Sequence, residues 1–131
     1  MDLKQLKDLS TAVEMTKGTI VINEGEAMPF SMYIILTGKV AVYKNFRDKG
    51  EVLIATLRPG EFFGEMSLFL SEPRNATVVT LETSLLLEVT QLNAYEIMEK
   101  VPAISYGIIM ALCERIRTLN QKLTSRDYTR G

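Results

Sequence analysis

The residues with the clearest chemical potential lie near the middle of the chain, where a glycine, a carboxylate and a guanidinium occur at short spacing. Gly64 and Glu65 open a helix-compatible stretch that ends at Leu70, and Arg74 follows nine positions after Glu65. The start of a helix leaves backbone N–H groups unpaired, which suits a phosphate. A guanidinium can hold a phosphate through two parallel hydrogen bonds. With Glu65 accepting hydrogen bonds from hydroxyl groups, this set suits a phosphorylated sugar. The alternative, a surface glutamate and a solvated arginine, stays open because exposed charges usually contribute little.

The composition argues against several kinds of catalytic and metal site. The chain of 131 residues has no histidine and one cysteine. Histidine is the commonest general base and metal ligand, and a single cysteine forms neither an intramolecular disulfide nor a zinc site. The net charge of −1 lacks the basic excess that is typical of nucleic-acid binding. We therefore expect a binding module and not an enzyme, with no metal and no cofactor.

The length and the N-terminus bound the organisation of the chain. At ~100–200 residues per domain, we expect a single domain over residues 1–131. The first residues are charged where a signal peptide needs an apolar core, and no apolar run approaches the ~18 residues of a membrane span. These features favour a cytoplasmic protein without a membrane partner.

Short apolar runs rich in β-branched residues, separated by turn residues, fill the chain from residue 13 to residue 90. This pattern is typical of a small antiparallel β-roll, or jelly roll. It predicts strands at residues 19–22, 32–36, 40–43, 52–57, 76–81 and 85–89, and two short edge strands near Glu14 and Phe62. We thus expect about eight strands. Glycine adopts positive φ at low cost, which predicts tight turns at Gly18, Gly25, Gly38, Gly50 and Gly60.

Helices are predicted on both sides of this roll, so the fold class is mostly β with flanking helices. Leucines at three-residue spacing predict a short N-terminal helix from Asp2 to Ser10, within a segment that covers residues 1–12. Residues 91–124 predict two C-terminal helices, of which the second begins at Pro102 and runs to about Leu123. Residues 125–131 form a tail.

The central segment, residues 60–78, resembles the phosphate-binding cassette of the cyclic-nucleotide-binding domain family. The matching residues are Phe63-Gly64-Glu65-Met66-Ser67-Leu68 and, further on, Pro73-Arg74-Asn75-Ala76-Thr77. The resemblance extends outward to Gly18-Thr19-Ile20, to Glu24-Gly25-Glu26 and to the run from Tyr33 to Val40. The resemblance covers roughly residues 10–123. The family that it points to includes kinase regulatory subunits, gated channels and catabolite-activator-like regulators.

The resemblance implies a role for each matching residue. The arginine at position 74 binds the equatorial phosphate oxygens, and the glutamate at position 65 accepts the ribose 2′-hydroxyl. The backbone amides of the short cassette helix complete the phosphate site, and small residues after the arginine line the pocket. The implied ligand-binding residues are Gly64, Glu65, Met66, Ser67, Arg74, Asn75 and Ala76. Asn75 departs from the small residue that is usual at its position, and its amide can donate or accept. We therefore expect cAMP as the ligand but leave cGMP open.

The second C-terminal helix carries apolar residues at alternating spacings of three and four. They are Ile109, Leu112, Ile116, Leu119 and Leu123, a pattern that indicates a coiled-coil seam of about two heptads. The seam predicts a homodimer; the alternative is a helix packed on its own β-roll. In the family this helix also serves as a lid over the base, for which the candidates are Thr118, Leu119, Leu123 and Tyr128. We expect the neighbouring Cys113 to be a small buried apolar residue.

Taken together, we expect a cyclic-nucleotide sensor without catalytic activity, in which the ligand repositions the C-terminal helices. The alternative is the sensor fragment, or a degenerate relative, of a catabolite-activator-like transcription regulator or of a channel or transporter, acting as a dimerisation module. Eight residues after Leu123 are too few for a helix-turn-helix, so we expect no direct DNA binding. A cupin-like metalloenzyme is disfavoured because the chain has no histidine.

The seam generates a first prediction. Leu119→Asp places a charge in the apolar seam, so it is expected to split a dimer that this helix forms. Sedimentation measures the association state of the variant and of the unmodified protein. If both are monomers, the helix packs internally and the intermolecular seam is contradicted.

Overall fold

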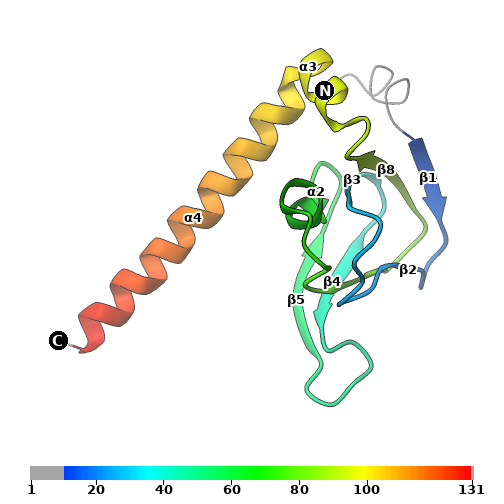
Figure 1. Ribbon diagram of the computed structural model, residues 1–131. Helices are drawn as coiled ribbons and strands as arrows, with labels where there is room; N and C mark the ends of the chain where they lie inside the picture. The colour runs from blue at the N-terminus through cyan, green and yellow to red at the C-terminus, as the bar shows by residue number, and fades with distance from the viewer. Residues whose placement is uncertain (1–10, 131) are drawn as a thin grey trace.

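Two antiparallel sheets of four strands each form the body of the protein. The computed structural model describes the backbone of residues 11–130 and the side chains of residues 12–124. One sheet has the strand order β1-β8-β3-β6 and the other β2-β7-β4-β5 (Figure 1). The strands are β1 (Thr11–Met15), β2 (Ile20–Ile22), β3 (Ser31–Thr37), β4 (Val40–Lys44), β5 (Val52–Leu57), β6 (Phe62–Phe63), β7 (Thr77–Thr80) and β8 (Ser84–Thr90). The helices are α2 (Glu65–Leu70), α3 (Ala94–Lys100) and α4 (Pro102–Arg130).

This architecture confirms the predicted β-roll with its cassette helix and two C-terminal helices. The two edge strands expected near Glu14 and Phe62 are β1 and β6. One boundary was wrong: Thr11 and Ala12 belong to β1 and not to an N-terminal helix, because they pair with Glu88 and Leu87 of β8. A second boundary was also wrong: residues 125–130 continue α4 to Arg130 and do not form a tail, because the helical backbone hydrogen bonding does not stop near Leu123. The predicted helix from Asp2 to Ser10 and the last residue, Gly131, lie outside the described residues.

The buried core has two parts that share β3. Side chains alternate between the faces of a strand, and both faces of β3 are buried. Tyr33 and Ile35 join a cluster between the two sheets. Met32 and Ile34 face the other way, into a cluster to which all three helices contribute. The apolar residues of β3 therefore fix the helices and the second sheet on opposite sides of one strand.

Helix α4 packs on the roll only through its first turns. Ile104 and Ile108 are buried, whereas the rest of the helix projects away from the sheets (Figure 1). The seam residues Ile109, Ile116, Leu119 and Leu123 are each more than half exposed, whereas the fifth, Leu112, is partly buried and packs against the core of its own chain. Most of the seam thus does not pack on its own roll, and whether it joins two chains stays a prediction. Cys113 is exposed, so its predicted burial was wrong; it lies off the face of α4 that packs on the roll through Ile104, Ile108 and Ala111. Among the described helices, none has both the length and the apolar character that crossing a membrane requires.

The turn between β3 and β4 yields a second prediction. All five glycines predicted to occupy turns have positive φ, but only at Gly38 would a Cβ collide, 2.1 Å from Ser84 Oγ and 2.6 Å from Ser84 Cα. At Gly18 a Cβ would meet nothing within 4 Å. Gly18→Ala is therefore expected to lower the free energy of unfolding by about 1–2 kcal/mol through backbone strain alone. Gly38→Ala is expected to lower it by roughly 1–3 kcal/mol more, through overpacking. Urea denaturation of both variants checks this, and equal losses would contradict the packing argument.

Candidate ligand-binding site

The cassette turns from β6 into α2 at a position where only glycine fits. Gly64 has φ +86°, in the left-handed region, and a Cβ there would lie 2.8 Å from both Arg74 Nη1 and the Ser31 carbonyl oxygen. The backbone of the cassette therefore comes directly against the side chain of Arg74 and the start of β3. Helix α2 then begins with Glu65, so the conformation of Gly64 fixes where the Glu65 carboxylate lies.

Arg74 is the buried cation of this site. It is 5% exposed, and its Nη1 donates to the carbonyl oxygens of Ser31 at 2.6 Å and Gly64 at 3.4 Å. Its Nη2 donates to the carbonyl oxygen of Pro29 at 2.9 Å and to Ser31 Oγ at 3.1 Å. Burial lowers the pKa of the Arg74 guanidinium from its ordinary value. These four bonds tie Arg74 to the start of β3, to Pro29 just before it and to Gly64 of the cassette, and they involve both terminal nitrogens but not Nε.

Glu65 is the buried carboxylate, and its partner comes from α4. It is 7% exposed and forms an ion pair with Arg115, whose side chain is about half exposed. The Arg115 guanidinium also lies over the Phe62 ring, 5.3 Å from its centroid. The alternative of a surface glutamate and a solvated arginine is therefore wrong, because Glu65 and Arg74 are both buried. Arg115 thus links the long helix to the cassette by an ion pair.

Sequence reasoning missed Arg115, although a signal was present. The face of α4 that contacts the roll carries Ile104, Ile108 and Ala111, and Arg115 continues the same helical spacing one turn further. A cation on an otherwise apolar face indicates a buried acidic partner. That partner could have been sought in Glu65.

A cavity of about 570 Å³ opens between the cassette, β4, β5 and α4. One wall is apolar and includes Val42, Ile54, Ala55 and Leu57. The polar part of the lining includes Gly64, Glu65, Asn75, Lys44 and Arg115. The Lys44 ammonium donates to the Asn75 carbonyl oxygen at 2.6 Å and pairs with the Glu24 carboxylate at 3.1 Å. A hydrogen bond from the Asn45 backbone N–H, and next the bond from the Lys44 ammonium, lower the pKa of the Glu24 carboxyl group. Such a cavity suits a small ligand with a flat apolar part and a polar part.

Two stacked aromatic rings, those of Phe63 and Tyr33, lie at the cavity. Phe63 lines it and stacks on Tyr33 with ring centroids 5.3 Å apart. Tyr33 donates its hydroxyl to Glu88 at 2.7 Å. Burial, and next this hydrogen bond, raise the pKa of Tyr33 to about 12, so the phenol stays neutral at physiological pH.

The structure brings part of the predicted ligand-binding set together at the cavity. Gly64, Glu65, Asn75 and Ala76 line it. Ser67 is buried within α2, Met66 is 42% exposed, and Arg74 lies behind Gly64. The roles assigned to these residues stay predictions.

The lid candidates lie away from the cavity. Thr118 and Leu119 border a shallow depression on α4 together with Glu114 and Arg115, and Leu123 is exposed. They do not cover the roll of their own chain, because α4 leaves it before reaching them (Figure 1). The side chain of Tyr128 lies outside the described residues.

Comparison with known proteins gives three likenesses that bear on this site. The family described as cyclic nucleotide-binding domain matches residues 12–101. A CRP-like cAMP-activated global transcriptional regulator of Mycobacterium tuberculosis is 31% identical over 119 residues, which are 89% of this chain and 52% of the regulator. A cAMP-dependent protein kinase regulatory subunit of Yarrowia lipolytica is 42% identical over 82 residues, 62% of this chain and 20% of the subunit. The chain thus spans about half the length of the first protein and a fifth of the second.

Among solved structures, the catabolite activator protein of Thermus thermophilus has the same fold. It superposes with a TM-score of 0.79 at 24% sequence identity, over 92% of this chain and 56% of that protein. At this identity the likeness concerns the arrangement of strands and helices.

The ion pair between the cassette and α4 generates a third prediction. Arg115→Met leaves the Glu65 carboxylate buried without its partner, so it is expected to lower the free energy of unfolding by roughly 1–3 kcal/mol. Arg117→Met is the matched control, because Arg117 pairs with Glu114 on the exposed surface of the same helix. It is expected to change stability by no more than about 0.5 kcal/mol. Urea denaturation compares the two, and equal effects would contradict a buried role for Arg115.

Proposed function

The chain belongs to the cyclic nucleotide-binding domain family, and we propose that it is a sensor domain that binds cAMP in the cavity beside the cassette without catalysing its breakdown. The observation that carries the proposal is the cavity itself. Its lining combines apolar residues of β4 and β5 with the buried Glu65, Gly64, Asn75 and Ala76 of the cassette. The names of the regulator and the kinase subunit, both of which refer to cAMP, favour adenine as the base.

The cyclic phosphate belongs at the end of the cavity formed by Gly64 and Asn75, with Arg74 behind it. A buried guanidinium attracts an anion more strongly than a solvated one, because the surrounding dielectric is low. Nε takes part in none of the four bonds that hold Arg74. Arg74 can therefore keep its place between β3 and the cassette while its charge and its Nε–H serve the phosphate.

The ribose belongs beside Glu65. A carboxylate has about four lone-pair positions, so Glu65 can accept a 2′-hydroxyl without releasing Arg115. The ligand would then join the ion pair instead of replacing it. Lys44 and the side chain of Asn75 belong to the same polar part of the lining, where they can read polar atoms of the base.

The response would travel through Arg115 to α4. A ligand that donates a hydrogen bond to Glu65 changes where the Arg115 guanidinium pairs best with this carboxylate. Because Arg115 belongs to α4, the helix moves with it. It can shift this equilibrium only by its differential affinity for the two helix positions. The exposed seam residues Ile109, Ile116, Leu119 and Leu123 favour a second element of the proposal, a homodimer through α4.

Because the chain spans about half of the related regulator, we propose a sensor unit of a regulator, channel or transporter as the alternative setting. In that setting, the same site would act on a further domain.

The fourth prediction tests the ribose contact. The protein, checked for nucleotide carried through purification, is titrated calorimetrically with cAMP, cGMP and 2′-deoxy-cAMP. A hydroxyl bonded to a carboxylate contributes about 1.5 kcal/mol or more, so cAMP is expected to bind at least ~10-fold more tightly than its 2′-deoxy analogue. In Glu65→Gln the acceptor is neutral, and this preference is expected to fall about fivefold. Glu65→Gln is a cleaner test than substitution of Arg74, whose loss would leave three carbonyl groups without their donor.

The matched control is Glu114→Gln, an exposed glutamate of α4 whose partner is Arg117. It is expected to keep the preference of the unmodified protein. Absence of binding by any of the three nucleotides to an empty, folded protein would overturn the proposed function. Binding without a preference for the 2′-hydroxyl would overturn the role of Glu65 alone.

A further inference from the structure

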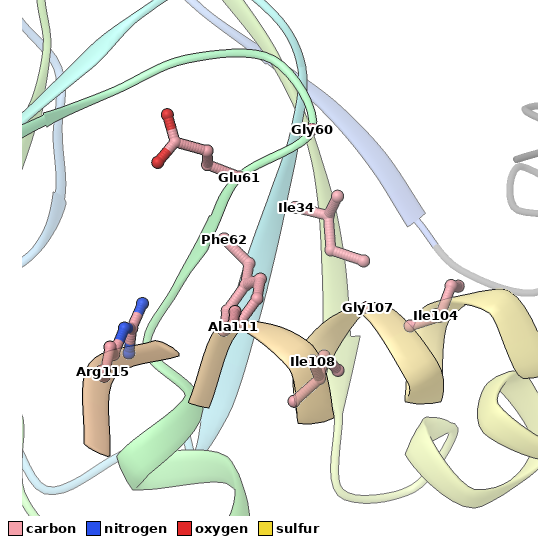
Figure 2. A pocket seen from close by; sticks show the side chains of 9 residues that line it. All are labelled: Ile34, Gly60, Glu61, Phe62, Ile104, Gly107, Ile108, Ala111 and Arg115. Carbon is pink, nitrogen blue, oxygen red and sulfur yellow. The ribbon is translucent and has the colours of Figure 1, made fainter. Parts of the chain in front are cut away.

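A second, smaller cavity lies between α4 and the roll. It has a volume of about 160 Å³. Ile34 and Phe62 point toward it from the sheet, and Ile104, Ile108 and Ala111 border it on α4 (Figure 2). Its walls are thus mostly hydrocarbon, and they come from two parts of the molecule that are far apart in the sequence.

We propose that this cavity is a second binding site, which accepts a small uncharged molecule with a single aromatic ring. The size carries the first step. An enclosed cavity of about 150 Å³ lined by leucine, isoleucine and phenylalanine binds benzene. This cavity has nearly the same volume and an apolar lining of isoleucine, phenylalanine and alanine, and it is partly open to solvent. One ring fits it, whereas a nucleotide does not.

The charges around the cavity carry the second step, because they favour a neutral molecule. Two charged residues border it, Glu61 and Arg115. The Glu61 carboxylate points away from α4 (Figure 2), and it accepts a hydrogen bond from the Arg58 backbone at 3.1 Å. Arg115 is paired with Glu65. Among the described residues that border the cavity, neither charge is therefore placed to offset that of an ion held inside it.

The rim of the cavity on α4 is also left open. Gly107 is exposed at this rim, and a Cβ added there would meet nothing within 4 Å. No side chain at this position therefore obstructs the entrance of a small ring.

The site goes beyond the proposed nucleotide function, yet it touches the same structural parts. Phe62 and Arg115 border both cavities. A molecule between α4 and the roll would therefore press on the ring and the guanidinium that also form the wall of the larger cavity. Its binding would act on the position of α4 from the opposite side of Phe62.

The fifth prediction tests this site with toluene as the probe and benzoate as its charged counterpart. In the full chain with labelled isoleucine methyl groups, toluene is expected to cause saturable NMR shifts at Ile34, Ile104 and Ile108. Intermolecular NOEs from toluene to these methyl groups would place it in the cavity. Benzoate is expected to bind at least tenfold more weakly, because a carboxylate loses hydration there without gaining a partner.

Two variants that fill the cavity and one matched control make the test specific. Ala111→Leu is expected to weaken toluene binding at least tenfold, and Gly107→Leu, at an exposed position of the rim, is the second filling variant. Ala103→Leu makes the same change as Ala111→Leu at an exposed position of the same helix and is expected to leave binding unchanged. Absence of shifts and NOEs in the unmodified protein would overturn the proposal. Unchanged toluene binding in a folded filling variant would also overturn it.

Discussion

The guanidinium of Arg74, enclosed by backbone carbonyl groups, is the interaction on which the site depends. A buried cation needs acceptors, and they are supplied by Pro29 before β3, by Ser31 at the start of β3 and by Gly64 of the cassette. This arrangement allows no side chain at Gly64, since a Cβ would lie 2.8 Å from Arg74 Nη1. It therefore explains, in one step, why the cassette turns where it does and why α2 begins with a buried carboxylate.

That carboxylate connects the rigid roll to the projecting helix. Glu65 is held by the cassette, and its partner Arg115 belongs to α4, whose first turns pack on the opposite face of β3 from the second sheet. A ligand that binds at the polar residues of the larger cavity therefore acts on α4 through the ion pair between Glu65 and Arg115. Phe62, beneath the Arg115 guanidinium, separates this polar contact from the apolar contact of Ile104 and Ile108. The position of the helix therefore depends on one polar and one apolar contact.

The sequence predicted what local periodicity and local motifs determine. Alternation and turn glycines located the long strands closely, and the motif from Gly64 to Ala76 located the cassette. Edge strands were expected near Glu14 and Phe62, but their bounds depend on pairing with distant strands, with β8 at Thr11 and with β3 at Phe62, which no local pattern encodes. Arg115 and Glu65 are separated by 50 positions, so their meeting required the fold. The exposure of Cys113 likewise depends on which face of α4 packs on the roll.

The central claim is that a cyclic nucleotide lies in the larger cavity with its base against β4 and β5. The most direct measurement is a crystal structure of the protein with 8-bromo-cAMP, recorded at a wavelength that reveals bromine by anomalous scattering. The account predicts a bromine peak inside the cavity, beside the apolar wall that contains Val42 and Ile54, with the ribose next to Glu65. A bromine peak at saturating ligand that lies only outside this cavity would contradict the account.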